Sequence, residues 1–351
     1  MAPKLGYLLP TRERIMEGKP ETGPLLALAE RAEALGFDSV WVGDSLLARP
    51  RHDPLTLLAG VAARTRRMQL GTAVLLPALR NPVVLAHQLA TLDQLSEGRL
   101  ILGVGIGPDV PSVRAEFAAA GVPFDGRVGR MMEGLRLCRA LWTGAPVRWD
   151  GRWQLADATL APRSWTEAGP PIWMGGRARP TRLRAGRWFD GWMPISPAPA
   201  DWARQWTDVA AAAREAGRDP ARLCGAMYLT LFVDPDPARA EQRLNAFLEE
   251  YYAQPASRIR AGQACYAGSA GGLAALLAEY AQAGVQHFVL RFAGAHERHL
   301  EALAAARAEL GWEGGRPIYG SCGRSKVACR SRSIASWSTR PTSTVEVPRV
   351  L

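Results

Sequence analysis

Residues 69–107 read QLGTAVLLPALRNPVVLAHQLATLDQLSEGRLILGVGIG, and this stretch decides the fold class. It begins and ends with extended apolar runs, QLGTAVLLP and LILGVGIG, which are typical of strands buried on both faces. Between them lies a segment with the apolar periodicity of a helix. Asn81 is placed as its N-cap residue and Pro82 in its first turn, so a helix is predicted to begin here. A strand, one helix and a second strand predict a βαβ unit, whose crossover requires a parallel sheet.

The same unit repeats toward the N-terminus. Extended apolar runs begin near Leu5, Ser39, Gln69 and Leu100, at intervals of 34, 30 and 31 residues. Helical patterns separate them, GPLLALAERAEALG in residues 23–36 and DPLTLLAGVAART in residues 53–65, where Asp53 is the expected cap. Strands that alternate with single helices predict a mainly parallel α/β fold.

Four further apolar runs lie in the second half of the chain. They are PIWMGG (171–176), DGWMPI (190–195), CGAMYLTLFV (224–233) and HFVLRFAG (287–294). The total of eight strands favours a (β/α)8 TIM barrel over an open sheet. The helical pattern ERHLEALAAARAELGW, residues 297–312, is expected to close it, with His296 and His299 at the surface because no third metal ligand accompanies them.

Two segments depart from the repeat. Residues 108–170 contain one clear helix, at about 127–142, followed by a Trp-, Arg- and Pro-rich stretch, which predicts an insertion after the fourth strand. Residues 313–351 are rich in Ser, Thr and Arg and have no apolar period. They predict a basic, disordered tail that follows a barrel domain of residues 1–312.

Charge and cysteine usage exclude several classes of protein. The net charge is +10, but the tail, with seven Arg or Lys and two acids, holds +5 of it. The other positive charges are dispersed among acids along residues 1–312. A nucleic-acid partner is therefore disfavoured. The sequence contains no run of about 18 apolar residues, so no membrane span is predicted. The five scattered cysteines form no C-x-x-C pair, which suits a reducing cytoplasm and argues against a zinc site.

Functional residues of such a barrel are expected at the carboxyl-terminal ends of its strands. That rule selects Asp44 and Ser45 after the second strand, and also Glu13 and Arg14 after the first, for which a solvated loop is the default. The run GVGIG, residues 103–107, lacks the last glycine of a dinucleotide-binding motif, so both close packing and ligand contact stay open.

The run MGGRARPTRLRAG, residues 174–186, favours anion binding more strongly. Gly175 and Gly176 end a strand before a helical pattern, where free backbone N–H groups can hold a phosphate and Arg177 adds a forked donor. The alternative is an ordinary strand-to-helix turn with solvated arginines.

The body of the chain resembles the luciferase-like monooxygenase superfamily, flavin- or deazaflavin-dependent oxidoreductases with a (β/α)8 fold. The resemblance rests on LGFDSVWVGD (35–44), on residues 70–107 and on PPIWMGG…RWFDGWMP (170–194), and it covers about residues 5–312. It implies that Asp44 and Ser45 lie beside the cofactor ring. It also implies a non-proline cis peptide at Ala73 and Val74 against the ring, a second contact at Ile106 and Gly107, and a phosphate grip at Gly175, Gly176 and Arg177.

One position departs from the alcohol-oxidising relatives that use a deazaflavin, which commonly have a histidine directly after the aspartate. Here that residue is Ser45, and an unassisted hydroxyl does not accept a proton near neutral pH as imidazole does. Asp44 and Ser45 are therefore interpreted as a cofactor platform rather than an acid–base pair. His52 is a candidate substitute base, although a helix-start residue without a catalytic role is the simpler interpretation.

The main interpretation is an oxidoreductase that acts on a small organic substrate, either by monooxygenation with reduced FMN or by hydride transfer with coenzyme F420. A non-catalytic flavin-binding protein is the alternative. A metal-dependent barrel hydrolase is weaker, because no convergent set of His, Asp and Glu is evident and no metal site is predicted. A separate flavin or F420 reductase and a homo-oligomer are the further expected partners. The charge distribution and the lack of a long apolar run predict no nucleic-acid and no membrane partner.

Overall fold

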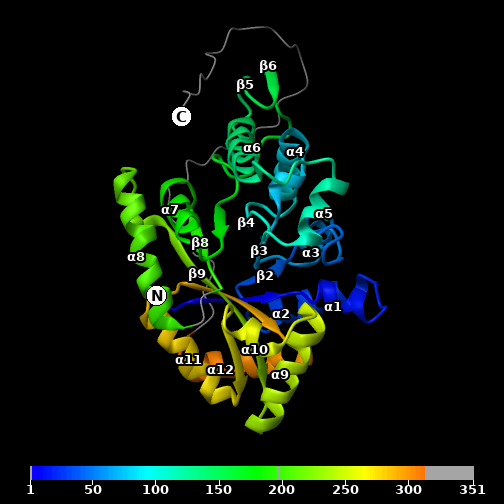
Figure 1. Cartoon of the computed structure of the whole chain (residues 1–351), viewed down its shortest axis with the longest axis vertical. Coiled ribbons are helices and arrows are strands. Elements are labelled where there is room, and N and C mark those ends of the chain that lie inside the picture. Colours follow the sequence, from blue (N-terminus) through cyan, green and yellow to red (C-terminus); the bar gives the residue numbers. More distant parts are fainter. Residues whose placement is uncertain (1, 196–197, 313–351) are drawn as a thin grey trace, which may run out of the picture.

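The computed structural model describes residues 2–195 and 198–312, and a closed barrel of parallel strands forms its centre (Figure 1). In order around the barrel, the strands are β1 (Lys4–Leu8), β2 (Ser39–Val42), β3 (Gln69–Thr72), β4 (Leu100–Val104), β7 (Ile172–Gly175), β8 (Gly191–Met193), β9 (Cys224–Val233) and β11 (His287–Phe292). The barrel closes because β11 pairs with β9 and β1, and β9 also pairs with β8. These strands coincide with the eight predicted runs, so the predicted (β/α)8 fold is confirmed.

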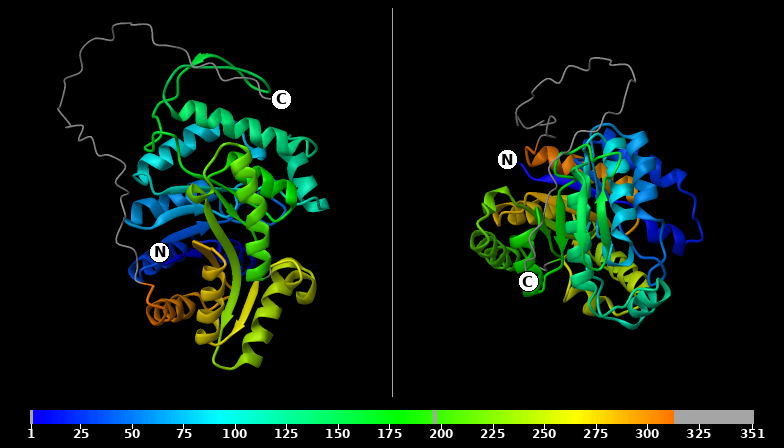
Figure 2. Two further views of the ribbon diagram at one scale, coloured as in Figure 1. Left: turned by 90° about the vertical axis from the view of Figure 1, so that its left-hand side faces the viewer. Right: turned by 90° about the horizontal axis from the view of Figure 1, so that it is seen from above.

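Helices surround the barrel, as the view from above in Figure 2 shows. The longer helices are α2 (Gly23–Ala34), α3 (Pro54–Arg64), α4 (Pro82–Leu95), α6 (Arg127–Trp142), α7 (Arg179–Trp188), α8 (Pro199–Glu215), α9 (Pro237–Tyr252), α11 (Ala270–Gln282) and α12 (His296–Glu309). The shorter ones are α1 (Thr11–Met16), α5 (Pro111–Ala119), α10 (Ala256–Arg260) and the 3-10 turns η1 (Pro77–Leu79) and η2 (Pro220–Arg222). Both predicted caps are present, since Asp53 accepts from the N–H of Thr56 and Asn81 from that of Val83, each at 2.9 Å.

The segment after β4 contains more structure than the sequence predicted. Helix α6 has the predicted bounds, and it packs against α4 as the barrel helix between β4 and β7. The prediction of a single helix was incomplete, because α5 and an antiparallel hairpin, β5 (Val147–Asp150) and β6 (Gln154–Ala158), are also present. The hairpin lies beyond α6 at the top of Figure 1. Helix α5 escaped prediction because one of its few buried residues is Glu116, which interrupts the apolar pattern.

Large side chains fill the barrel interior. An apolar cluster separate from the main core consists of Leu8, Trp41, Ile101, Trp173, Met193, Ala226 and Val289. Glycine makes room for it, because a Cβ atom on Gly71 would lie 2.1 Å from the indole ring of Trp41. A barrel filled in this way is a packed core rather than a pore, so a ligand must bind at one of its ends.

The closing helix α12 lies closer to the barrel than expected. His299 is fully buried, and its Nε2 accepts from the N–H of Val233 at 2.9 Å. The expected surface position of His299 was therefore wrong, because α12 packs this face against β9. No helix in the described part of the chain is both long and apolar enough to cross a membrane. The predicted tail, residues 313–351, lies outside the described residues.

Candidate cofactor and active site

The segment that follows β3 lies between two neighbouring strand ends. The Ala73–Val74 peptide is cis, as the resemblance implied. The two methyl groups of Val74 face β4 and β7, because a Cβ atom on Gly105 would lie 2.5 Å from one of them and a Cβ atom on Gly175 2.7 Å from the other. Glycine is therefore required at both positions for Val74 to lie between the two strands. Leu75 fixes the segment to β4, donating to the carbonyl of Gly103 and accepting from the N–H of Gly105, both at 2.8 Å.

The end of β4 turns sharply beside this segment. Gly107 has a φ of +70°, a left-handed conformation that favours glycine. Ile106 is only partly buried, and its carbonyl accepts from Nε of Arg127 at 2.9 Å. The backbone of residues 105–107 is thus held from the α6 side.

The end of β7 has the features expected of an anion site. Gly176 has a φ of +115°, and its carbonyl accepts from Nε1 of Trp192 at 2.8 Å. Helix α7 begins soon afterwards, at Arg179, and no side chain caps its N-terminus. The Arg177 side chain is exposed and forms no ion pair with any described residue. A free guanidinium beside an uncapped helix N-terminus fits the phosphate of a flavin-type cofactor.

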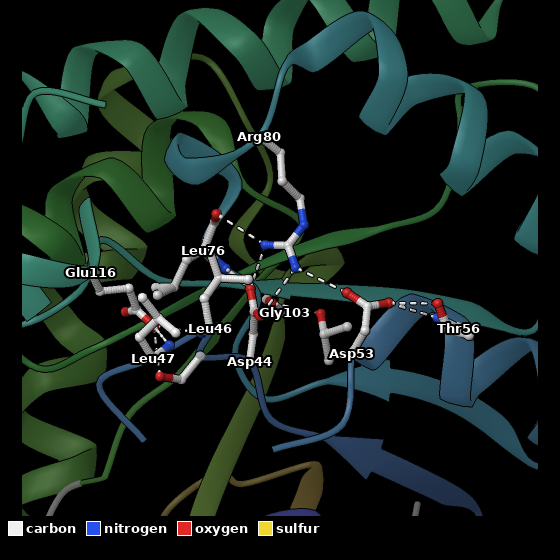
Figure 3. Close-up of polar contacts among 11 residues, drawn as sticks. Asp44, Leu46, Leu47, Asp53, Thr56, Leu76, Arg80, Gly103 and Glu116 are labelled. Carbon is white, nitrogen blue, oxygen red and sulfur yellow. Dashed lines mark hydrogen bonds and ion pairs between the residues drawn. The ribbon is translucent and has the colours of Figure 1, made fainter. Parts of the chain in front are cut away.

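Asp44, directly after β2, is held in an ion pair with an arginine that the sequence analysis missed. Its carboxylate is 1% exposed and accepts from Nη1 and Nη2 of Arg80 at 2.6 and 3.1 Å, and from the N–H of Leu76 at 2.9 Å (Figure 3). Burial favours a lower pKa for Arg80, but the hydrogen bonds and charge of Asp44 outweigh it and raise that pKa. Asp44 therefore fixes the chain after the cis peptide and is not a free base.

Ser45 is engaged by a buried carboxylate from α5. Its hydroxyl donates to Oε1 of Glu116 at 2.8 Å and accepts from the N–H of Arg49 at 2.9 Å. The same Glu116 oxygen accepts from the N–H of Leu46 and, at 2.8 Å, from that of Leu47 (Figure 3). Glu116 is 1% exposed, and it was missed because α5 was not predicted. Ser45 thus organises its loop rather than presenting a free hydroxyl.

His52 has a different set of neighbours. Its Nε2 donates to the carbonyl of Pro20 at 2.7 Å, so the ring faces the connection between α1 and α2. No hydrogen bond in the described part of the chain joins it to Asp44 or Ser45. The structure therefore does not bring the three predicted catalytic residues together as one proton relay, and Asp44 and Ser45 are held by Arg80 and Glu116 instead.

Two charged residues at the same barrel end were not predicted as a pair. Arg291, near the end of β11, is 2% exposed, and its Nη2 lies 3.3 Å from a carboxylate oxygen of Glu13. Its guanidinium also stacks on the ring of Tyr251, 3.4 Å from the ring centroid. An arginine within the apolar run HFVLRFAG was a signal available in the sequence, because a charged residue is rarely buried without a partner. The described residues contain no cluster of three or more potential metal ligands.

Comparison with known proteins identifies the family. Residues 3–314 match the family model described as luciferase-like monooxygenase. The chain is 31% identical over 257 residues to the 5,10-methylenetetrahydromethanopterin reductase of Methanolobus tindarius, covering 70% of this chain and 76% of that protein. It is 36% identical over 251 residues to the F420-dependent glucose-6-phosphate dehydrogenase of Kineococcus radiotolerans, covering 68% of this chain and 70% of that protein.

A solved structure agrees with this assignment. The monooxygenase RslO1 from Streptomyces bottropensis superposes with a TM-score of 0.75 at 25% identity, over 87% of this chain and 99% of that one. The family model matches nearly all of the described residues. The same residues form the barrel, the cis peptide and the glycine-rich strand ends. The chain belongs to the luciferase-like monooxygenase family and is an F420- or flavin-dependent oxidoreductase.

Proposed function

We propose that the chain binds F420 across the carboxyl-terminal ends of β3, β4 and β7 and uses it to oxidise or reduce a small organic substrate. The observation that supports this most is Val74, which lies between Gly105 and Gly175 and forms an apolar bed with bare backbone on both sides. When bound, the cofactor supplies hydride transfer, or oxygen activation if it is reduced FMN, and the protein orients and shields it.

The residues around this bed have distinct roles in the proposal. Ala73 and Val74 support one face of the ring, and the backbone at Ile106 and Gly107 contacts its edge or the ribityl chain. Asp44 and Ser45 hold these segments in place through Arg80 and Glu116.

The phosphate belongs at the other end of this bed. Gly175 and Gly176 allow it to approach the backbone at the start of α7, and the guanidinium of Arg177 neutralises its charge. A phosphate site requires a backbone that the anion can approach closely, and next to it a cation that no acidic side chain neutralises.

The choice of F420 rests on similar proteins. The Kineococcus relative at 36% identity is named as F420-dependent, whereas the Streptomyces structure, at 25% identity, is named as a monooxygenase. The three proteins compared above are all enzymes, so we propose turnover rather than passive flavin binding. A separate reductase that recycles the cofactor, a homo-oligomeric assembly and a cytoplasmic location complete the proposal.

Fluorescence titration of the full-length protein with F420 and, separately, with FMN tests this function. We expect saturable quenching with F420, and weaker or no quenching with FMN. Arg177→Ala should weaken the affinity roughly tenfold to a hundredfold, because a hydrogen bond to a charged group contributes about 1.5–3 kcal/mol. Arg222→Ala is the control, since Arg222 is also exposed and forms no ion pair with a described residue. Binding of neither cofactor would refute the function, and unchanged affinity in Arg177→Ala would place the phosphate elsewhere.

A further inference from the structure

A group of arginines lies at the same end of the barrel as the candidate site, on the adjoining arc. Arg12 is in α1, directly after β1, and Arg49 and Arg51 are in the loop between β2 and α3. Arg291 is near the end of β11. Because β11, β1 and β2 are adjacent parallel strands, all four residues lie at or beyond the carboxyl-terminal ends of one arc. The proposed cofactor bed on β3, β4 and β7 occupies the next arc. Arg51 lies nearest to it, because a Cβ atom on Gly43 would lie 2.2 Å from Nη1 of Arg51 and 3.5 Å from the carbonyl oxygen of Ala73.

Tyr251 and Tyr252, at the end of α9, contact all four arginines. The guanidinium carbons of Arg291 and Arg12 lie 3.4 and 4.4 Å from the centroid of the Tyr251 ring. Nη2 of Arg51 donates to the Tyr251 hydroxyl at 3.2 Å. The guanidinium carbon of Arg49 lies 4.9 Å from the centroid of the adjacent Tyr252 ring. Cation–π contacts of this kind hold the cations in place but do not neutralise them.

The positive charge of this group is not balanced. Arg291 is paired with Glu13, whereas Arg12, Arg49 and Arg51 form no ion pair within residues 2–195 and 198–312. Nε and Nη1 of Arg12 are buried and have no hydrogen-bond partner there. Burial lowers the pKa of Arg12, and the charges of the three neighbouring arginines lower it further. Repulsion between the guanidinium charges and buried N–H groups without acceptors both destabilise the folded protein. A bound anion would relieve both, because it carries negative charge and supplies acceptors.

We propose that Arg12, Arg49 and Arg51 bind a phosphate or carboxylate group of the substrate. Guanidinium groups present planar forks that match the paired oxygens of either group, and the orphan N–H groups of Arg12 gain acceptors from it. The proposal rests on the proposed function, which assigns the cofactor and its phosphate to the β3–β4–β7 arc. An anion on the β11–β1–β2 arc then belongs to the molecule that lies beside the cofactor at the barrel mouth.

Thermal unfolding in inorganic phosphate tests the site, with sodium chloride at matched ionic strength as reference. The full-length protein carries Arg177→Ala throughout, so that the proposed cofactor phosphate site is weakened. We expect phosphate to raise the melting temperature saturably beyond chloride. The double variant Arg12→Gln, Arg51→Gln should lose this effect, with an affinity loss of roughly tenfold or more for each guanidinium. Arg243→Gln should keep it, because Arg243 is exposed on α9 and forms no ion pair with a described residue. The variant Arg12→Lys, Arg51→Lys retains the charge and should retain part of the effect if the Gln variant folds poorly.

A second set of titrations identifies the source of the anion. If it belongs to the substrate, phosphate still stabilises the cofactor-loaded protein, and the Gln variant binds F420 and FMN as the wild type does. In the Arg177→Ala background, competition between phosphate and cofactor, or an equal loss of cofactor affinity in the Gln variant, would overturn the assignment. So would a phosphate effect that is absent from the wild type or unchanged in the Gln variant. Failure of the proposed function has a different signature, in which neither cofactor binds while the phosphate effect persists and depends on the arginines.

Discussion

At the scale of single residues, Asp44 and Ser45 are adjacent, yet each is held by a partner from a different part of the chain. Their position at a strand end was readable from the sequence, because the apolar run before them marks the strand. Their partners Arg80 and Glu116 were not, since a contact across 36 or 71 residues leaves no local pattern. His52 was a candidate by residue type alone, and the fold turns it toward Pro20.

We expect Asp44→Asn to destabilise the protein by about 3 kcal/mol or more, because removing one partner of a buried pair leaves the other charge uncompensated. Asp53→Asn is the matched control. Asp53 also contacts Arg80, at 3.4 Å, but its side chain is 48% exposed and asparagine preserves the helix cap, so the loss should stay below about 1 kcal/mol. Urea unfolding of both variants measures the difference. Equal losses would contradict the view that Asp44 anchors this site.

At the scale of elements, short segments outside the regular repeat fix the site. Helix α5 supplies Glu116 to the loop after β2, although it lies in the segment interpreted as an insertion. The barrel strands were predictable because parallel strands buried on both faces appear as continuous apolar runs. The hairpin and β10 (Cys265–Gly268) were not, since they are short and largely exposed or half-buried.

Glu116→Ala should release the loop that carries Ser45. Hydrogen exchange at the amides of Leu46 and Leu47 should accelerate roughly tenfold or more, because each loses an acceptor on a charged group worth about 1.5–3 kcal/mol. Glu133→Ala serves as the control, since Glu133 accepts from the backbone N–H of Arg152 on the distant hairpin, at 2.7 Å. It should leave exchange at Leu46 and Leu47 unchanged. The same rates in wild type and Glu116→Ala would show that the carboxylate does not hold the loop.

At the scale of the whole molecule, three histidines whose pKa is lowered by burial, His287, His296 and His299, make stability depend on pH. Burial lowers the pKa of His287 and of His296 from 6.5 to about 3, and His287 is hydrogen-bonded to Ser39 at 2.7 Å inside the barrel. Between pH 6.5 and about 3 the unfolded chain therefore binds protons that the folded protein does not. Their contribution is complete above pH 6.5 and is lost as the pH falls toward 3.

We expect the free energy of unfolding to decrease from pH 7 to pH 4, and His287→Gln to make this decrease shallower. Glutamine is uncharged at all these pH values, so it removes one of the three histidines whose lowered pKa favours proton uptake by the unfolded chain. His87→Gln is the control, because His87 is exposed on α4. Urea unfolding at several pH values gives the slopes. An identical slope in wild type and His287→Gln would assign the acid sensitivity to other groups.

Deletion of residues from about 314 onward should leave the melting temperature and the cofactor affinity unchanged. The composition of this segment, with its scattered charges and few apolar residues, predicts no contribution to a packed core. Thermal unfolding and F420 titration of the shortened chain measure both quantities. A large decrease in either would show that the domain extends beyond residue 312.

The filled interior of the barrel also matters for protein engineering. Trp41, packed against Gly71, closes the barrel beneath the site, and neither residue needs to contact a ligand. A library that varies exposed residues of the loops around the barrel mouth, while it keeps Asp44, Ser45, Gly107 and Glu116, therefore samples new substrate preferences on an unchanged foundation. By the same geometry, a side chain at position 71, 105 or 175 would clash with Trp41 or Val74, so we expect a library that varies these positions to consist mostly of destabilised clones.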